Sequence, residues 1–260
     1  MLKSVIKRTP VYRGIQKARV IHHYRLYRQP RAAAGYLLAD PELSNFTYDI
    51  ANRDELAAFV AEVAGCEAFM ALEYIAELDA DQEFSAALAY LLASRPHQKR
   101  PALYGRRLGW YAIVRALKPS LVFETGTSDG LGAAVLGRAM QRNSVGRAIT
   151  FDIKDWTGWL IPQDLPVERV IGDSTITLPE TVARCGSPDL LLHDSDHSYA
   201  HELGEFEALY QPGMLLLTDN VHATTALADF ARSRGLTFAY WLERPLDHWY
   251  PGSGIGAAGH

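Results

Sequence analysis

The sequence LVFETGTSDGLGAAVL, residues 121–136, predicts a strand, a glycine-rich turn and a helix in direct succession. Its turn reads Glu-x-Gly-x-x-x-Gly-x-Gly, with Glu124 followed by Gly126, Gly130 and Gly132. A dinucleotide-binding turn reads Gly-x-Gly-x-x-Gly, and a Walker loop ends in Gly-Lys-Ser/Thr, so the chain matches neither pattern. A ligand with a cationic amino-acid end and no phosphate to cradle therefore suits this turn better.

Further apolar runs follow, and most of them end at or near an acidic residue. They are AITFDI (148–153), VERVIGD (167–173), PDLLLHD (188–194), GMLLLTDN (213–220), LTFAYWLE (236–243) and the glycine-rich GSGIGAAGH (252–260). The spacers are long enough for crossover helices, so the sequence predicts an α/β fold with a doubly wound, mostly parallel, seven-stranded sheet. Because such sheets bind ligands at the carboxyl ends of their strands, we expect the acids there to line one crevice.

The part before this sheet is expected to be helical. Asn52 followed by Glu55 resembles a capping box, Gly65 supplies a stop, and further helices are expected at about 67–78, 82–94 and 104–117. The chain therefore divides into a basic arm (1–51), a helical cap region (52–103) and a ligand-binding domain (104–260). The cap region would cover the acceptor site or form an interface in a homo-oligomer.

Charge is distributed unevenly along the chain. The net charge is −4, but residues 1–31 carry nine Lys/Arg and no acid, which leaves 17 basic against 30 acidic residues in the remainder. The arm could lie on an anionic membrane, bind an acidic partner or dock on the chain's own acidic body. Nucleic acid is not expected as a partner, because the body is acidic and has no recognition motif. Two distant cysteines and the lack of a long apolar run favour a cytoplasmic protein, and contact of the basic arm with a membrane would make it membrane-peripheral.

S-adenosylmethionine has groups that suit the acidic strand ends, because it combines an ammonium, a carboxylate, a sulfonium and a nucleoside. Asp152 could accept hydrogen bonds from both ribose hydroxyls, and Asp173 could reach the adenine amino group. With Glu124 and the three glycines, Thr127 and Ser174 complete the predicted cofactor site. Each acid taken alone could equally be the N-cap of the helix that follows its strand.

The segment LLLHDSDHSY (190–199) places His193, Asp194, Asp196 and His197 directly after an apolar strand. Folding alone gives no reason for this crowding, although Asp194 or Asp196 could cap a helix that begins near Tyr199. In the same way, Asp219 and Asn220 could simply order the loop after the fifth strand. Arg106 and Arg107, which precede the first strand, could approach a cofactor carboxylate or an anionic substrate, or lie on an exposed helix face.

Five segments resemble, in order, the motifs of class I S-adenosylmethionine-dependent methyltransferases: LVFETGTSDGLGAAVL, FDIK, VIGDSTITLPE, DLLLHDSDHSY and PGMLLLTDN. Within that superfamily the chain is most similar to cation-dependent O-methyltransferases of the catechol and caffeoyl-coenzyme A type, and to sugar and macrolide O-methyltransferases with an Asp-x-x-His motif. The resemblance implies a metal held by Asp194, Asp219 and Asn220, and a general base at His197 beside Asp194. Such oxygen ligands favour Mg2+, while His193 and His197 leave zinc open.

The sequence therefore predicts a Mg2+-assisted, S-adenosylmethionine-dependent O-methyltransferase that methylates a hydroxyl of a sugar, polyketide or other small natural product. Two alternatives stay open. One is an NAD(P)-dependent Rossmann-like oxidoreductase, which the spacing of the glycines disfavours. The other is a catalytically silent methyltransferase-like module that binds a partner through the basic arm.

Overall fold

The computed structural model describes residues 17–18, 21–22, 30–38, 48–94, 102–246, 248 and 250–259. Most of the basic arm lies outside these residues, so its contact with a membrane, a partner or the acidic body stays a prediction. Among the helices of the described residues, none has the length and apolar character needed to cross a bilayer.

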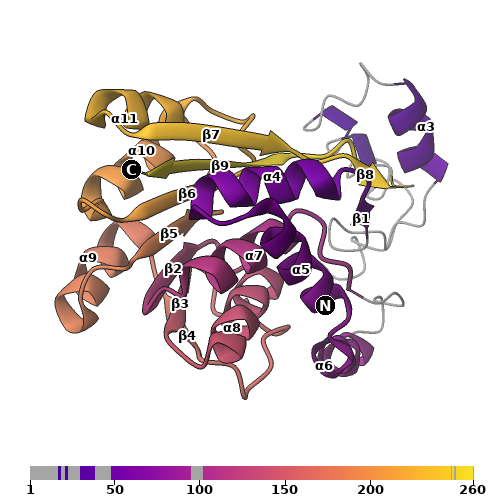
Figure 1. Cartoon of the computed structure of the whole chain (residues 1–260), viewed down its shortest axis with the longest axis horizontal. Coiled ribbons are helices and arrows are strands. Elements are labelled where there is room, and N and C mark those ends of the chain that lie inside the picture. The colour runs from indigo at the N-terminus through magenta and orange to yellow at the C-terminus, as the bar shows by residue number, and fades with distance from the viewer. Residues whose placement is uncertain are drawn as a thin grey trace, which may run out of the picture.

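A seven-stranded sheet forms the centre of the molecule (Figure 1). Its strands are β2 (Leu121–Thr125), β3 (Arg147–Asp152), β4 (Val167–Ile171), β5 (Leu190–His193), β6 (Leu215–Asp219), β7 (Thr237–Leu242) and β9 (Gly254–Gly259). They lie in the order β4-β3-β2-β5-β6-β9-β7, and β9 pairs antiparallel with both of its neighbours while the other pairs are parallel. The predicted fold class is confirmed.

Helices cover both faces of this sheet. The helices whose bounds lie within the described residues are α3 (Pro30–Leu38), α4 (Arg53–Ala64), α5 (Ala68–Asp79), α6 (Gln82–Ala93), α7 (Arg107–Leu117), α8 (Leu131–Asn143), α9 (Ser174–Cys185), α10 (Tyr199–Leu209) and α11 (Ala226–Arg234), and α3 is not one of those on the faces of the sheet (Figure 1). Figure 1 shows α4, α5, α7 and α8 on one face and α9, α10 and α11 on the other. Successive strand residues therefore enter different cores: Leu190 and Leu192 pack on the first side and Leu191 on the second.

The helices of residues 52–103 pack into the same core as the sheet. Leu56 of α4 lies against Gly109 of α7, where a β-carbon would come within 2.8 Å of the leucine side chain. A two-stranded ladder joins β1 (Asp49–Ile50) to β8 (Pro245–Leu246), so the chain before α4 is tied to the segment after β7. The division at residues 51 and 103 stays a prediction.

The expected capping box at the start of α4 is wrong. Asn52 makes no side-chain cap; its Nδ2 donates to Glu55 Oε2 and to the Leu242 carbonyl, and its Oδ1 accepts from the Arg244 amide. The side chain therefore connects the helix to the end of β7. The stop at Gly65 is confirmed, with a left-handed φ of 62° that suits glycine.

Candidate active site

A pocket of about 600 Å3 lies at the carboxyl ends of β2, β3 and β5. Its lining includes five of the predicted site residues: Gly126, Asp152, Asp173, Ser174 and Asp194. Trp156, Ser195, Asp196 and His201 also line it. The Trp156 side chain is 60% exposed, and the Lys154 ammonium lies 5.4 Å from the centroid of its ring, so the opposite face of the ring is the one that could stack on a flat ligand. The sheet thus brings together lining residues that lie up to 76 positions apart in the sequence, from Thr125 to His201.

The glycine turn presses directly on the end of β5. Gly126 has φ 92°, and a β-carbon at this position would lie 1.9 Å from the Asp194 carbonyl oxygen. The Asp194 amide in turn donates to the Thr125 carbonyl at 2.8 Å. Only glycine fits here, and the close approach holds Asp194 beside the turn.

Backbone amides hold the two acids that line the pocket after β3 and β4, Asp152 and Asp173. Asp152 accepts from the Ser128 amide and the Lys154 amide, each at 2.9 Å. Asp173 caps α9 by accepting from the amide of Thr175 at 3.0 Å, and hydrogen bonds from Thr175 lower its pKa. Asp173 is therefore the N-cap of the helix that follows its strand, which was the alternative to a cofactor role, and it also lines the pocket.

Other predicted cofactor residues face protein rather than the pocket. The Thr127 hydroxyl lies 2.7 Å from that of Thr150, and a β-carbon on Gly130 would meet the Gly158 backbone at 2.9 Å. Glu124 is 1% exposed, and burial raises its pKa to about 8. Its carboxylate fills the space in front of Gly132, where a β-carbon would lie 2.1 Å away. Contact of these residues with a cofactor stays a prediction.

Three groups that could ligate a metal meet next to this pocket. Asp194, His197 and Asp219 each offer one ligand atom, and these atoms lie within 4.8 Å of one another. His197 Nε2 is 3.6 Å from Asp194 Oδ1. Burial and the negative charge of Asp219 raise the pKa of Asp194 to about 6. Two converging carboxylates of this kind, with an imidazole beside them, fit a divalent cation, which would relieve their mutual repulsion.

Asn220 adopts a left-handed backbone conformation with φ 53° directly after β6. Its Nδ2 lies 2.7 Å from His197 Nε2, and its Oδ1 accepts from the Ser253 hydroxyl. The amide thus orients the imidazole, while its oxygen faces Ser253 rather than the two carboxylates. A metal contact of Asn220 stays a prediction, and it requires the amide to turn over.

Sequence reasoning missed the role of Arg106, because an exposed helix face was an open alternative for it. Arg106 is 2% exposed, and its Nε and Nη2 donate to the two oxygens of Asp219. Its Nη1 donates to Tyr48 Oη at 2.8 Å and to Glu243 Oε1 at 3.1 Å. Burial would raise the pKa of Asp219, but the charge and hydrogen bonds of Arg106 outweigh it and lower the pKa to about 2. The exposed-face alternative is wrong for both arginines, since Arg107 is 7% exposed.

A buried carboxylate under the pocket was also missed. Glu205 of α10 is 1% exposed and is bonded at 2.6–3.1 Å by a group of polar side chains: Thr125, Ser174, His193, Ser195 and His201. These hydrogen bonds hold the pKa of Glu205 well below its usual range, against the effect of burial. The network joins β2, β5, α9 and α10 and therefore fixes the floor of the pocket. No sequence pattern marks it.

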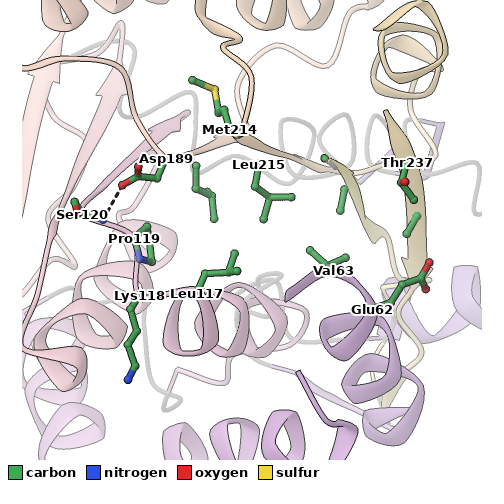
Figure 2. A pocket seen from close by; sticks show the side chains of 15 residues that line it. Glu62, Val63, Leu117, Lys118, Pro119, Ser120, Asp189, Met214, Leu215 and Thr237 are labelled. Atoms are coloured by element: carbon green, nitrogen blue, oxygen red, sulfur yellow. Dashed lines mark hydrogen bonds between the residues drawn. The ribbon is translucent and has the colours of Figure 1, made fainter. Parts of the chain in front are cut away.

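A second cavity, of about 560 Å3, lies at the opposite end of the sheet (Figure 2). Its lining is mixed, with Pro119, Leu190 and Met214 beside polar residues such as Asp189, which accepts a hydrogen bond from the Ser120 amide at 2.7 Å. Ligands of doubly wound sheets bind at the carboxyl ends of the strands. The chemistry is therefore assigned to the first pocket.

Comparison with known proteins agrees with this placement. The family model described as a methyltransferase domain matches residues 123–221, which run from β2 through the end of β6. This part of the chain is therefore similar to a methyltransferase domain. The glycine turn, the Asp194 strand end and the Asp219 strand end all lie within it. A search of the curated proteins finds no match to the chain.

Two solved structures have a similar fold over 69% and 66% of the chain. An O-methyltransferase from Bacillus cereus in complex with S-adenosylhomocysteine (SAH) has a TM-score of 0.51 and 16% identity, over 69% of this chain and 91% of that chain. The O-methyltransferase TomG from Streptomyces achromogenes, in complex with S-adenosylmethionine (SAM), has a TM-score of 0.50 and 18% identity, over 66% and 88%. At these identities the likeness establishes the fold and not the acceptor.

Proposed function

We propose that the chain is a SAM-dependent O-methyltransferase, assisted by a divalent cation, that acts on a small-molecule hydroxyl. One observation carries the proposal: a single pocket runs from Asp152 and Trp156, which suit a nucleoside, to Asp194, which lies beside His197 and Asp219. The cofactor and the acceptor would then meet at the end of β5. The resemblance to sugar and macrolide O-methyltransferases favours a sugar, polyketide or other natural product as the acceptor.

Methyl transfer is an in-line displacement at the sulfonium carbon, so the acceptor oxygen must be aligned with that carbon and lose its proton. Holding two reactants in line supplies roughly 7–11 kcal/mol of such a barrier. His197 is suited to take the proton once the Asn220 amide is turned over, because Nε2–H then donates to the amide oxygen and Nδ1, which has no partner within the described residues, is left as the basic nitrogen. Burial opposes the charged imidazolium, but the hydrogen bond and charge of Asp194 outweigh it and raise the pKa of His197.

Asp194 and Asp219 would hold the cation, with Asn220 or His197 as a further ligand. A divalent cation bound here lowers the pKa of a coordinated hydroxyl and orients it toward the methyl group. Oxygen ligands favour Mg2+. Arg106 already neutralises part of the charge on Asp219, so the site would bind a cation more weakly than two free carboxylates would.

Calorimetry with SAH, SAM and NAD tests the cofactor. We expect both adenosyl ligands to bind and NAD not to bind, because the turn lacks the dinucleotide pattern. Binding of NAD alone would favour the oxidoreductase, and binding of none of the three would contradict the proposed function. Binding of the adenosyl ligands without any methyl transfer would favour the silent module.

A further inference from the structure

Two consecutive arginines at the start of α7 are buried, but only one of them has its hydrogen bonds satisfied. Arg106 bonds to Asp219, Tyr48 and Glu243, as described above. For Arg107, which is 7% exposed, neither Nε nor Nη1 has a hydrogen-bond partner within the described residues. A buried guanidinium with open donors is costly, and such groups in native proteins call for an explanation.

The ring of Trp110 supports the Arg107 guanidinium, whose central carbon lies 5.4 Å from the ring centroid. The same tryptophan packs beside Gly132, and the Glu124 carboxylate occupies the space in front of that glycine. Arg107, Trp110 and Glu124 therefore belong to one cluster at the carboxyl end of β2, next to the glycine turn.

This cluster holds the Arg107 guanidinium and the Glu124 carboxyl group, with no hydrogen bond between Glu124 and the Nε or Nη1 of Arg107. The charge of Arg107 acts on Glu124 and on Asp219, lowering the pKa of each against the effect of burial. Glu124 uses one oxygen to accept from the Thr150 hydroxyl at 2.6 Å. Within the described residues, Nε and Nη1 of Arg107 have no partner although two carboxylates are near enough for its charge to act on them, so both donors are open to a third acceptor.

We propose that Arg107 binds the carboxylate of the amino-acid end of the cofactor, while Glu124 faces the ammonium of the same end. This inference rests on the proposed function. The nucleoside end is assigned to Asp152 and Trp156 in the pocket, so the amino-acid end lies toward the glycine turn and this cluster. A guanidinium and a carboxyl group held apart suit the two charged ends of an amino acid, because a bound ammonium would lower the pKa of Glu124 and favour its carboxylate form.

The alternative is a structural role, in which the ring of Trp110 and the field of the nearby carboxylates are all that Arg107 needs. The two roles differ in a ligand-specific way. A structural arginine affects every adenosyl ligand alike, whereas a carboxylate-binding arginine affects only ligands that carry the carboxylate.

The test is calorimetry of the full chain with SAH and with its decarboxylated analogue, which keeps the ammonium. We expect the native chain to bind SAH about 10- to 100-fold more tightly than the analogue, as for one charge-assisted, buried pair of hydrogen bonds. In Arg107→Gln this preference should fall to roughly threefold or less, with little change in affinity for the analogue. Arg107→Lys should keep part of the preference, because it keeps the charge but loses the planar fork.

Arg115→Gln is the matched control, because this arginine lies on the same helix and bonds to Glu77, away from the pocket. It should leave the preference unchanged. The inference is overturned if the native chain binds both ligands equally, or if Arg107→Gln keeps the native preference or weakens both ligands alike. The comparison of SAH with its decarboxylated analogue on the native chain needs no variant, so the inference can be contradicted even if Arg107→Gln does not fold. Failure of both ligands to bind the native chain contradicts the proposed function itself, and this inference with it.

Discussion

Arg106 and Asp219 form a fully buried ion pair in which the guanidinium donates to both carboxylate oxygens. The pair connects the start of α7 to the end of β6 across 113 positions of sequence. It therefore links the helical part that precedes the sheet to the predicted metal site.

Loss of this arginine should be strongly destabilising. Arg106→Met leaves Asp219 and Glu243 buried without their cation, and we expect a loss of about 3–5 kcal/mol in the free energy of unfolding. Urea denaturation measures it. The control is Arg53→Met, which breaks the half-buried pairs with Asp49 and Asp79 and should cost at most about 1 kcal/mol. Equal losses of stability in Arg106→Met and Arg53→Met would contradict a special role of the buried Arg106 ion pairs in stability.

The glycine turn gives a second prediction, with a control built into the chain. Gly126→Ala places a β-carbon against the Asp194 carbonyl and should abolish SAH binding, because the turn and the end of β5 must move apart. Gly186→Ala has a similar φ, 89° against 92°, but meets no atom within 4 Å. It measures the backbone strain alone and should leave binding intact. Calorimetry with SAH checks both variants. If Gly126→Ala still bound SAH, the glycine turn would not be part of the cofactor site.

Glu124 should make stability depend on pH. Burial raises its pKa to about 8 from the ordinary 4.5, so the folded chain keeps a proton that the unfolded chain loses. This contribution is fully present below pH 4.5 and is lost as the pH rises through 8. Glu124→Gln, which cannot ionise, should therefore gain stability relative to the native chain between pH 5 and pH 8.5. Thermal melts across this range check it; parallel curves for the two chains would show that Glu124 does not titrate there.

Asp194 should be required for metal binding. We expect Mn2+, used as a probe for Mg2+, to bind the native chain and not Asp194→Asn, because the variant removes one of two converging carboxylates. Asp196→Asn is the control, since Asp196 also lines the pocket but lies outside the metal-capable group. Electron paramagnetic resonance titration reports the bound Mn2+. Equal binding by the two variants would return Asp194 to a structural role.

The sequence contains enough information to predict the sheet and the acids along its carboxyl edge. Apolar runs that end in acids repeat with crossover spacing, so the parallel strands and the positions of Asp152 and Asp194 at one edge could be expected. The glycine-rich last strand, β9, is the hardest strand to predict from sequence, because glycine disfavours strands. Close packing explains why this strand contains glycine: a β-carbon on Gly254 would lie 2.2 Å from the Trp241 carbonyl oxygen.

The parts of the site that could not be predicted are held by contacts distant in sequence. Arg106 looks like any arginine before a helix, and only the fold brings it to Asp219 and Glu243. Asn52 followed by Glu55 has the spacing of a capping box, but the end of β7 supplies better partners for the Asn52 side chain. Local patterns carry no information about such partners.

Transfer of a labelled methyl group tests the central claim most directly. The chain is incubated with methyl-labelled SAM, Mg2+ and a panel of hydroxyl-bearing sugars and polyketides or a small-molecule extract, and the products are analysed by mass spectrometry. We expect the label on an oxygen of a small molecule, with transfer lost in Asp194→Asn and strongly reduced in His197→Ala. Binding of the cofactor with no labelled product, or label attached to nitrogen or carbon instead, would contradict the account.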